Sequence, residues 1–175
     1  MITTLKGDLT KLDFDVIVVG VTNKFQSVPG FSAKVFHDAG EKFNETISGF
    51  SSLDIGSAKM VDSYHLPCKK IVLTACPVYG DGKQQEDEYL AACYWNSMSL
   101  AYKYMYDEKL EKVHVGFSSL GTSIFGYPNE EACKVALKTI KRLNNKFPET
   151  KVIDVCFVCD DTRDYMLYKE ALKLR

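Results

Sequence analysis

The sequence is poor in the features that mark nucleic-acid-binding and membrane proteins. No block of Lys and Arg stands out beyond Lys69-Lys70 and Lys141-Arg142, and the formal net charge is −1. The sequence therefore lacks the cluster of positive charge that nucleic-acid binding needs. No apolar run approaches the roughly 20 residues that a membrane helix needs, and Met1 to Lys6 is too short and too polar for a signal peptide. We therefore expect a cytoplasmic protein without a nucleic-acid or membrane partner.

A second zinc-type cysteine pair is also missing. Six cysteines are present, but only Cys156 and Cys159 have the Cys-x-x-Cys spacing. These two lie in an apolar strand pattern, in which residues i and i+3 point to opposite faces. Without a second pair, the spacing does not complete a zinc site. We expect reduced, buried thiols, and we expect neither a metal nor another cofactor.

Length and composition are those of an ordinary globular protein. The 175 residues are 46% hydrophobic and 26% charged, which favours one domain over residues 1–175. Apolar runs predict strands at Ile2–Leu5, Asp15–Val19, Ala58–Ser63, Lys70–Ala75, Val113–Phe117 and Val152–Val158. Helical spacing and end signals predict helices at Ser32–Ala39, Glu41–Ser48, Glu86 to about Tyr106, Asn129–Phe147 and Thr162 to about Leu174. This order predicts an α/β fold, a three-layer α/β/α sandwich with a mixed central sheet.

One loop stands out in this pattern. Ser118 to Gly126 follows the strand Val113–Phe117, precedes a helix that starts near Pro128, and contains only small or apolar residues. A small-residue loop between strand and helix directs backbone N–H groups and a helix N-terminus at one spot, which suits a phosphate. Alternatively, the loop is an ordinary connection whose glycines only relieve backbone strain. Because ligands bind at the carboxyl ends of strands in such folds, the segment Gly20 to Ser32 is expected beside it.

Several motifs together resemble the macro domain, a module that binds ADP-ribose. Gly7-Asp8-Leu9-Thr10 followed by Asp15-Val16-Ile17-Val18 is similar to its opening, and Thr122 to Pro128 is similar to its second phosphate loop. Further similar segments are Gly56-Ser57-Ala58, Tyr64-His65-Leu66-Pro67, Pro77-Val78-Tyr79, Tyr94-x-Asn96-Ser97, Phe157-Val158-Cys159-Asp160 and Tyr168. The resemblance covers the whole chain and is nearest to the branch of O-acetyl-ADP-ribose deacetylases and mono-ADP-ribosyl hydrolases.

The resemblance implies a set of binding residues. Asp8 would accept a hydrogen bond from the adenine amino group, and the N–H of Leu9 would serve the neighbouring ring nitrogen. Backbone amides of the second loop would surround the diphosphate, with Phe125 against the distal ribose. Alternatively, Asp8 only caps its own turn, and Phe125 only fills the core. The remaining expected binding residues are Gly30, Phe31, Ser32, Gly121, Thr122, Ser123, Ile124 and Gly126.

The same resemblance reveals departures in the first loop. The catalytic branch continues its second strand into Asn-Ala-Ala-Asn, followed by a glycine-rich loop and an Asp that positions or activates water. Counted without a gap, these asparagines become Val19 and Thr22, the Asp becomes Ser32, and only Gly30 of the glycine run remains. A shift by one residue would instead bring Asn23 to a ribose-orienting position. His37 or Asp38 could supply a base, or the substrate's own phosphate could assist.

These departures favour binding of ADP-ribose or a derivative, including an ADP-ribosylated protein, with weak or no hydrolase activity. Val28, Pro29 and Phe31 make the first loop bulky, and Pro29 has no N–H to donate. Asp160 follows Cys159 where the family usually has an aromatic residue, so stacking on adenine would be lost. One alternative is an active deacetylase or hydrolase that uses Asn23, Thr22 or Ser32. The other is a degenerate macro domain that recognises another nucleotide or a protein partner.

Overall fold

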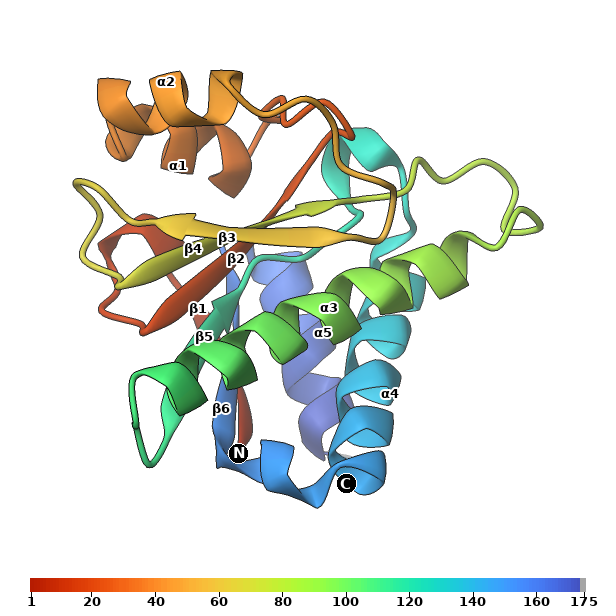
Figure 1. The fold of residues 1–175 in the computed structure, drawn as a ribbon. Coiled ribbons are helices and arrows are strands. Elements are labelled where there is room, and N and C mark those ends of the chain that lie inside the picture. Colours follow the sequence, from red (N-terminus) through yellow and green to blue (C-terminus); the bar gives the residue numbers. More distant parts are fainter. Residues whose placement is uncertain (174–175) are drawn as a thin grey trace.

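The protein is described by a computed structural model that covers residues 1–173. A six-stranded sheet lies between two layers of helices (Figure 1). The strand order is β1-β6-β5-β2-β4-β3, and every pair is parallel except β3 with β4. The strands are β1 (Ile2–Lys6), β2 (Val16–Val21), β3 (Ala58–Asp62), β4 (Lys70–Ala75), β5 (Val113–Phe117) and β6 (Ile153–Cys159). The mixed sheet and the three layers confirm the predicted fold class.

Helices cover both faces of the sheet (Figure 1). On the first face lie α1 (Phe31–Asp38) and α2 (Glu41–Ser48). On the second face lie α3 (Glu86–Asp107), α4 (Asn129–Lys146) and α5 (Thr162–Lys173). Short 3₁₀ turns complete the set: η1 (Leu9–Lys11), η2 (Ser123–Phe125) and η3 (Pro148–Val152). No helix among residues 1–173 is long and apolar enough to cross a membrane.

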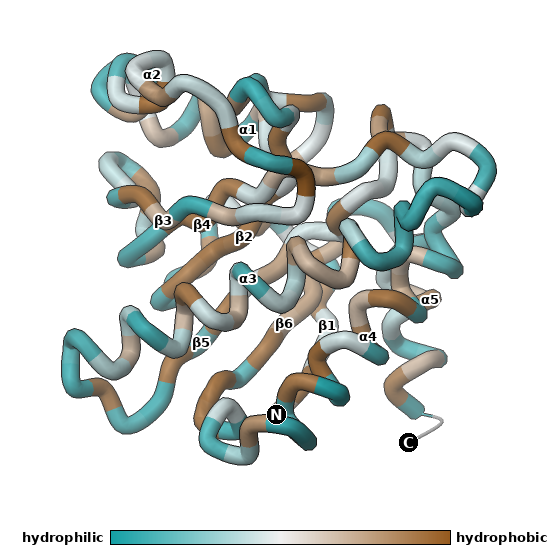
Figure 2. Tube along the Cα trace, turned by 45° about the vertical axis from the view of Figure 1, so that its right-hand side comes forward, coloured by the Kyte–Doolittle hydropathy of each residue, from teal (hydrophilic) through white to brown (hydrophobic). Residues whose placement is uncertain are grey.

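The central strand β2 explains why both helix layers are needed. All six of its residues are buried, because parallel strands in such a sheet are covered on both faces. Val16 and Val18 belong to the core beneath α3, α4 and α5, whereas Ile17, Val19 and Val21 belong to the core beneath α1 and α2. Figure 2 shows the strands as a hydrophobic centre and the loop before α3 as hydrophilic.

Sequence reasoning misplaced some boundaries. β2 was expected to end at Val19 but runs to Val21, because Gly20 and Val21 pair with Thr74 and Ala75 of β4. β6 is displaced by one residue, and α1 starts at Phe31 rather than Ser32. The expected end of the last helix at Leu174 lies outside the described residues.

The cysteines follow the expected pattern. Cys156 packs on the α1 and α2 side of β6 and Cys159 on the other side, so the two thiols face apart as predicted. Burial raises the pKa of Cys159 to about 12, opposed by a hydrogen bond from Thr4. Free thiols are found at Cys68, Cys76, Cys93, Cys156 and Cys159.

Candidate functional site

The two loops that sequence analysis placed side by side line one cleft at the carboxyl edge of the sheet. Its first part, here called the loop compartment, has a volume of about 350 Å³ and is lined by Val28–Ser32 and Ser118–Ser123 among others. Its second part, the Asp8 compartment, has a volume of about 600 Å³. Gly30, Phe31 and Asp160 line both compartments, so the two form a continuous cleft. The predicted neighbourhood of the loops is confirmed.

The second loop has a backbone suited to an anion. Gly121, Ser123 and Gly126 have φ angles of +79°, +60° and +75°, so the chain bends sharply at three points of the loop. The N–H of Gly126 bonds to the carbonyl of Ser123 at 3.0 Å and closes the turn η2. The N–H groups of Thr122 and Ser123 come before this bond in the chain and take no part in it. Such a concave run of amides is a general anion site.

Two of the predicted loop residues do not line the cleft, while a missed one does. Ile124 is 64% exposed, and neither it nor Gly126 is among the lining residues. Ser119 lines the cleft, and its enclosed Oγ makes no hydrogen bond of ordinary geometry in the described chain but lies close enough to the Cys159 thiol to lower the pKa of that thiol. A hydroxyl in this position can donate to a ligand oxygen. The sequence offered a signal for Ser119, since it lies among the small residues of the loop.

For Phe125 the sequence left two alternatives open, a contact with the distal ribose or a place in the core. Its ring is buried within the core of α3, α4 and α5, and it also lines the loop compartment. Its carbonyl accepts a hydrogen bond from the N–H of Tyr79 at 2.7 Å. Tyr79 also packs on Tyr127, with ring centroids 4.7 Å apart. The loop before α3 therefore supports the second loop from behind.

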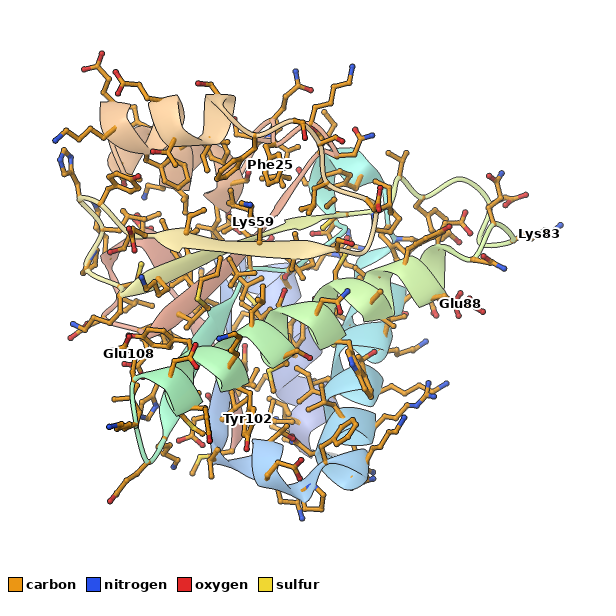
Figure 3. The ribbon with its side chains drawn as sticks, in the orientation of Figure 1. Phe25, Lys59, Lys83, Glu88, Tyr102 and Glu108 are labelled. Carbon is orange, nitrogen blue, oxygen red and sulfur yellow. The ribbon has the colours of Figure 1, made fainter. Side chains whose placement is uncertain are left out.

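The loop before α3 is itself organised by Glu86, a residue that sequence analysis did not single out. Oε1 of Glu86 accepts the N–H groups of Gly80 and Gly82 at 3.1 Å each, and Oε2 accepts that of Gln84 at 2.7 Å. Backbone hydrogen bonds, from its own N–H first and then from the loop, lower the pKa of Glu86 to about 2 against the effect of burial. Figure 3 shows Lys83 at the tip of this loop, pointing away from the body of the protein.

Asp8 lines the second compartment and caps a turn at the same time. Its Oδ1 accepts the backbone N–H of Thr10 at 3.0 Å and the Thr10 hydroxyl at 2.7 Å. Its Oδ2 forms an ion pair with Lys34. Burial acts to raise the pKa of Asp8, but the hydrogen bonds from Lys34 and Thr10 outweigh it and lower the pKa overall. Leu9 is buried at the first position of η1, where its N–H lies outside the turn's own bonds.

The front of the first loop is a tight turn that faces away from the cleft. Oγ1 of Thr22 accepts the backbone N–H of Gln26 at 3.1 Å, so the Thr22 side chain is used within the turn. The carbonyl of Asn23 accepts the N–H of Leu53 at 2.7 Å. Phe25 has a φ of 57° and packs on Phe50 at 5.1 Å between ring centroids, and Figure 3 shows its ring above β3. Neither Thr22 nor Asn23 is among the cleft-lining residues.

Of the three candidate catalytic residues, only Ser32 reaches the cleft. Ser32 is 4% exposed, and its Oγ accepts the N–H of Val28 at 3.2 Å. Val19 is fully buried in the core beneath α1 and α2. His37 is 88% exposed and pairs with Asp38 outside the cleft. The hydrogen bond from His37 is the main cause that lowers the pKa of Asp38 to about 2.

Carboxylates mark the far rim of the loop compartment. Oδ1 of Asp161 accepts the N–H of Asp164 at 2.9 Å and so begins α5. Asp164 is buried and accepts a hydrogen bond from the side chain of Asn129. Asp160 is exposed at the boundary between the compartments. Among residues 1–173, no group of three or more His, Cys, Asp or Glu side chains is arranged to hold a metal ion.

Fold and cleft together define a class of protein: a three-layer α/β/α domain with an amide-lined cleft at the strand ends. Comparison with known proteins names the family. The macro domain profile matches residues 21–136, and the chain belongs to the macro domain family. A macro domain-containing protein of Chlorobaculum tepidum is 31% identical over 98% of this chain and 95% of its own length.

Two further relatives are known by an activity or a bound ligand. The ADP-ribose glycohydrolase MACROD1 of Rattus norvegicus is 28% identical over 98% of this chain and 64% of its own length. A solved structure of an Oceanobacillus iheyensis macrodomain mutant with ADPR is 27% identical, with a TM-score of 0.84. It is matched over 98% of this chain and 91% of the solved chain. These relatives span the same fold from end to end of the present chain.

Proposed function

We propose that this protein binds ADP-ribose or an ADP-ribose derivative and hydrolyses it slowly or not at all. The observation that carries the proposal is the asymmetry of the cleft. The side formed by the second loop lines the cleft with Thr122 and Ser123, whose amides lie outside the bond that closes the turn. On the side formed by the first loop, Ser32 stands at the position that matches the carboxylate of the catalytic branch when counted without a gap, and Thr22 and Asn23 do not line the cleft.

The two compartments match the base and the diphosphate of such a ligand. A diphosphate in the loop compartment would accept hydrogen bonds from the amides of Thr122 and Ser123 and from Oγ of Ser119. The base would then occupy the Asp8 compartment, where Asp8 takes its amino group. The solved relative with ADPR supports this ligand, and the glycohydrolase relative supports looking for turnover. We infer a cytoplasmic protein whose partner is ADP-ribose, free or attached to another protein.

Calorimetric titration with ADP-ribose, combined with a turnover assay, tests the proposal. We expect saturable binding with one ligand per chain, and no release of product above the uncatalysed rate on the timescale of a typical enzyme assay. Binding of neither ADP-ribose nor ADP would contradict the proposal and favour another ligand. Rapid release of acetate from O-acetyl-ADP-ribose, or of ADP-ribose from an ADP-ribosylated carboxylate, would show an enzyme.

A further inference from the structure

The Asp8 compartment contains a cation that the sequence reading did not anticipate. Lys34 of α1 reaches across to η1 and pairs with Oδ2 of Asp8. Lys6 also lines this compartment, but its Nζ donates to Oγ1 of Thr162 at 2.7 Å. The other charged lining residue is Asp160. A ligand that binds the Asp8 carboxylate therefore shares it with the ammonium group of Lys34.

Backbone geometry holds Lys34 at the edge of the compartment. The helix α1 starts next to Gly30, and the N–H of Lys34 bonds to the Gly30 carbonyl at 3.2 Å. Lys34 thus lies one helical turn from the cleft-lining N-terminus. The Lys34 side chain is 45% exposed and that of Asp8 is 30% exposed. Both charged groups remain open to a ligand, whereas Oδ1 of Asp8 is already occupied by Thr10.

The Asp8–Lys34 pair offers an acceptor beside a donor, and purine bases differ in the hydrogen-bonding edge that they present to such a pair. Adenine presents an amino donor beside the acceptor N1, and a carboxylate beside a backbone N–H matches that edge. Hypoxanthine presents the reverse order, with the acceptor O6 beside the donor N1–H. An ammonium group carries three donors and a carboxylate only acceptors. Lys34 can therefore donate to O6 while Asp8 accepts N1–H, and Asp8 with the N–H of Leu9 still fits adenine.

We propose that Lys34 is a specificity-determining residue that lets the cleft bind 6-oxopurine ligands, such as inosine diphosphate ribose, alongside ADP-ribose. The inference rests on the proposed function, since it concerns the base end of the same ligand. Asp160 offers a carboxylate instead of a ring, and stacking on Phe31, the aromatic residue among the described lining residues, does not distinguish one purine from another. Hydrogen bonds to the base edge then carry most of the discrimination.

Titration of two ligands against matched variants tests this assignment. Wild type, Lys34→Met and Lys34→Arg are each titrated with ADP-ribose and with inosine diphosphate ribose, and Lys42→Met on the exposed face of α2 is the control. We expect wild type to bind the two ligands within about tenfold. Lys34→Met should lose affinity for the inosine ligand roughly ten- to hundredfold, the usual effect of removing a charged hydrogen-bond donor.

The remaining variants and outcomes separate the inference from the proposed function. Lys34→Met should bind ADP-ribose at least as well as wild type, Lys34→Arg should keep the inosine ligand, and Lys42→Met should change neither. A strong wild-type preference for ADP-ribose that Lys34→Met leaves unchanged would overturn the role of Lys34 and keep the proposed function. Equal loss of both ligands in Lys34→Met would also overturn it, because that pattern shows general attraction. Binding of neither ligand by folded wild type would overturn the proposed function itself.

Discussion

The two loops of the cleft have the same position in the fold but different construction. Both follow a buried parallel strand, β2 or β5, and both precede a helix. The second loop carries small side chains at Ser118, Ser119 and Gly121–Ser123, and the amides of Thr122 and Ser123 lie outside the bond that closes its turn. The first loop uses a side chain, that of Thr22, to close a turn and fills its remaining length with Val28, Pro29 and Phe31. Recognition of a diphosphate needs free amides, whereas hydrolysis needs placed side chains, so the two loops can diverge independently.

The largest expected effect concerns turnover, because it depends on the first loop alone. General acid–base assistance contributes about 10²–10⁴-fold, and wild type should fall short of an active relative by at least that factor. Ser32→Asp combined with Thr22→Asn should raise the residual rate on O-acetyl-ADP-ribose, since Ser32 lines the cleft. Thr22→Asn alone should have no effect, because that side chain faces its own turn. Fast wild-type turnover that Asn23→Ala abolishes would instead place catalysis at Asn23.

The next effect concerns the backbone of the second loop. Gly121 and Gly126 both have positive φ, so alanine at either costs about 1–2 kcal/mol of stability. Only Gly121 lines the cleft, and its new Cβ would meet Cδ1 of Leu90 at 3.0 Å and displace the loop. Gly121→Ala should weaken ADP-ribose binding by roughly 1.5–3 kcal/mol, the value of a charge-assisted hydrogen bond. Calorimetry on both variants measures this difference. An equal loss of ADP-ribose affinity in Gly126→Ala would indicate that the loop has only a structural role.

A smaller effect is expected at the opposite end of the cleft. Asp8→Ala removes the base acceptor, but wild-type Asp8 already shares its charge with Lys34. We therefore expect a loss of about 1.5 kcal/mol in ADP-ribose binding, the lower end for a charged hydrogen bond. Asp38→Ala is the matched control, since Asp38 also accepts the Thr10 hydroxyl but does not line the cleft. Equal losses in the two variants would indicate that Asp8 acts only through its turn.

The smallest effect concerns the support behind the second loop and depends on pH. The pKa of Glu86 falls from 4.5 to about 2 on folding, so its ionised form favours the folded state. Its contribution to the free energy of unfolding is complete above pH 4.5 and is lost as the pH falls towards 2. Glu86→Gln should lower the melting temperature at pH 7, and the difference from wild type should shrink in acid. A difference that grows as the pH falls would contradict this assignment.

The sequence predicted an element correctly wherever its local hydrophobic pattern agrees with its position in the folded structure. The strands Lys70–Ala75 and Val113–Phe117 and the helix Glu41–Ser48 have the expected bounds, because each is a clean apolar run or a capped amphipathic segment. The second strand was cut short at Val19, since Gly20 is a poor strand former and only its pairing with β4 keeps it in the sheet.

The site was less accessible from the sequence, for a physical reason. Asp8 and the loop Ser118–Gly126 are contiguous motifs, so pattern and resemblance reach them. Lys34 and Glu86 act through contacts across 26 residues to Asp8 and across a projecting loop to Gly80. The Lys34 contact depends on how α1 docks on the sheet, and no local spacing encodes it. The contacts of Glu86 with Gly80 and Gly82, and of Thr22 with Gln26, span only four to six residues, but the residue types alone do not fix the direction in which each loop turns.

Close packing beneath the cleft floor also limits how this site can change. A methyl group on Gly20 would lie 2.7 Å from Sγ of Cys76 and 3.6 Å from Cε2 of Phe125. Alanine stands at the matching position of the catalytic branch, in its Asn-Ala-Ala-Asn segment. Gly20→Ala therefore requires the Cys76 side chain to shift or to be replaced by a smaller one, because the sulfur occupies the space that the new methyl needs. The thiol thus couples two positions 56 residues apart in the sequence: what residue 20 can be depends on what stands at residue 76.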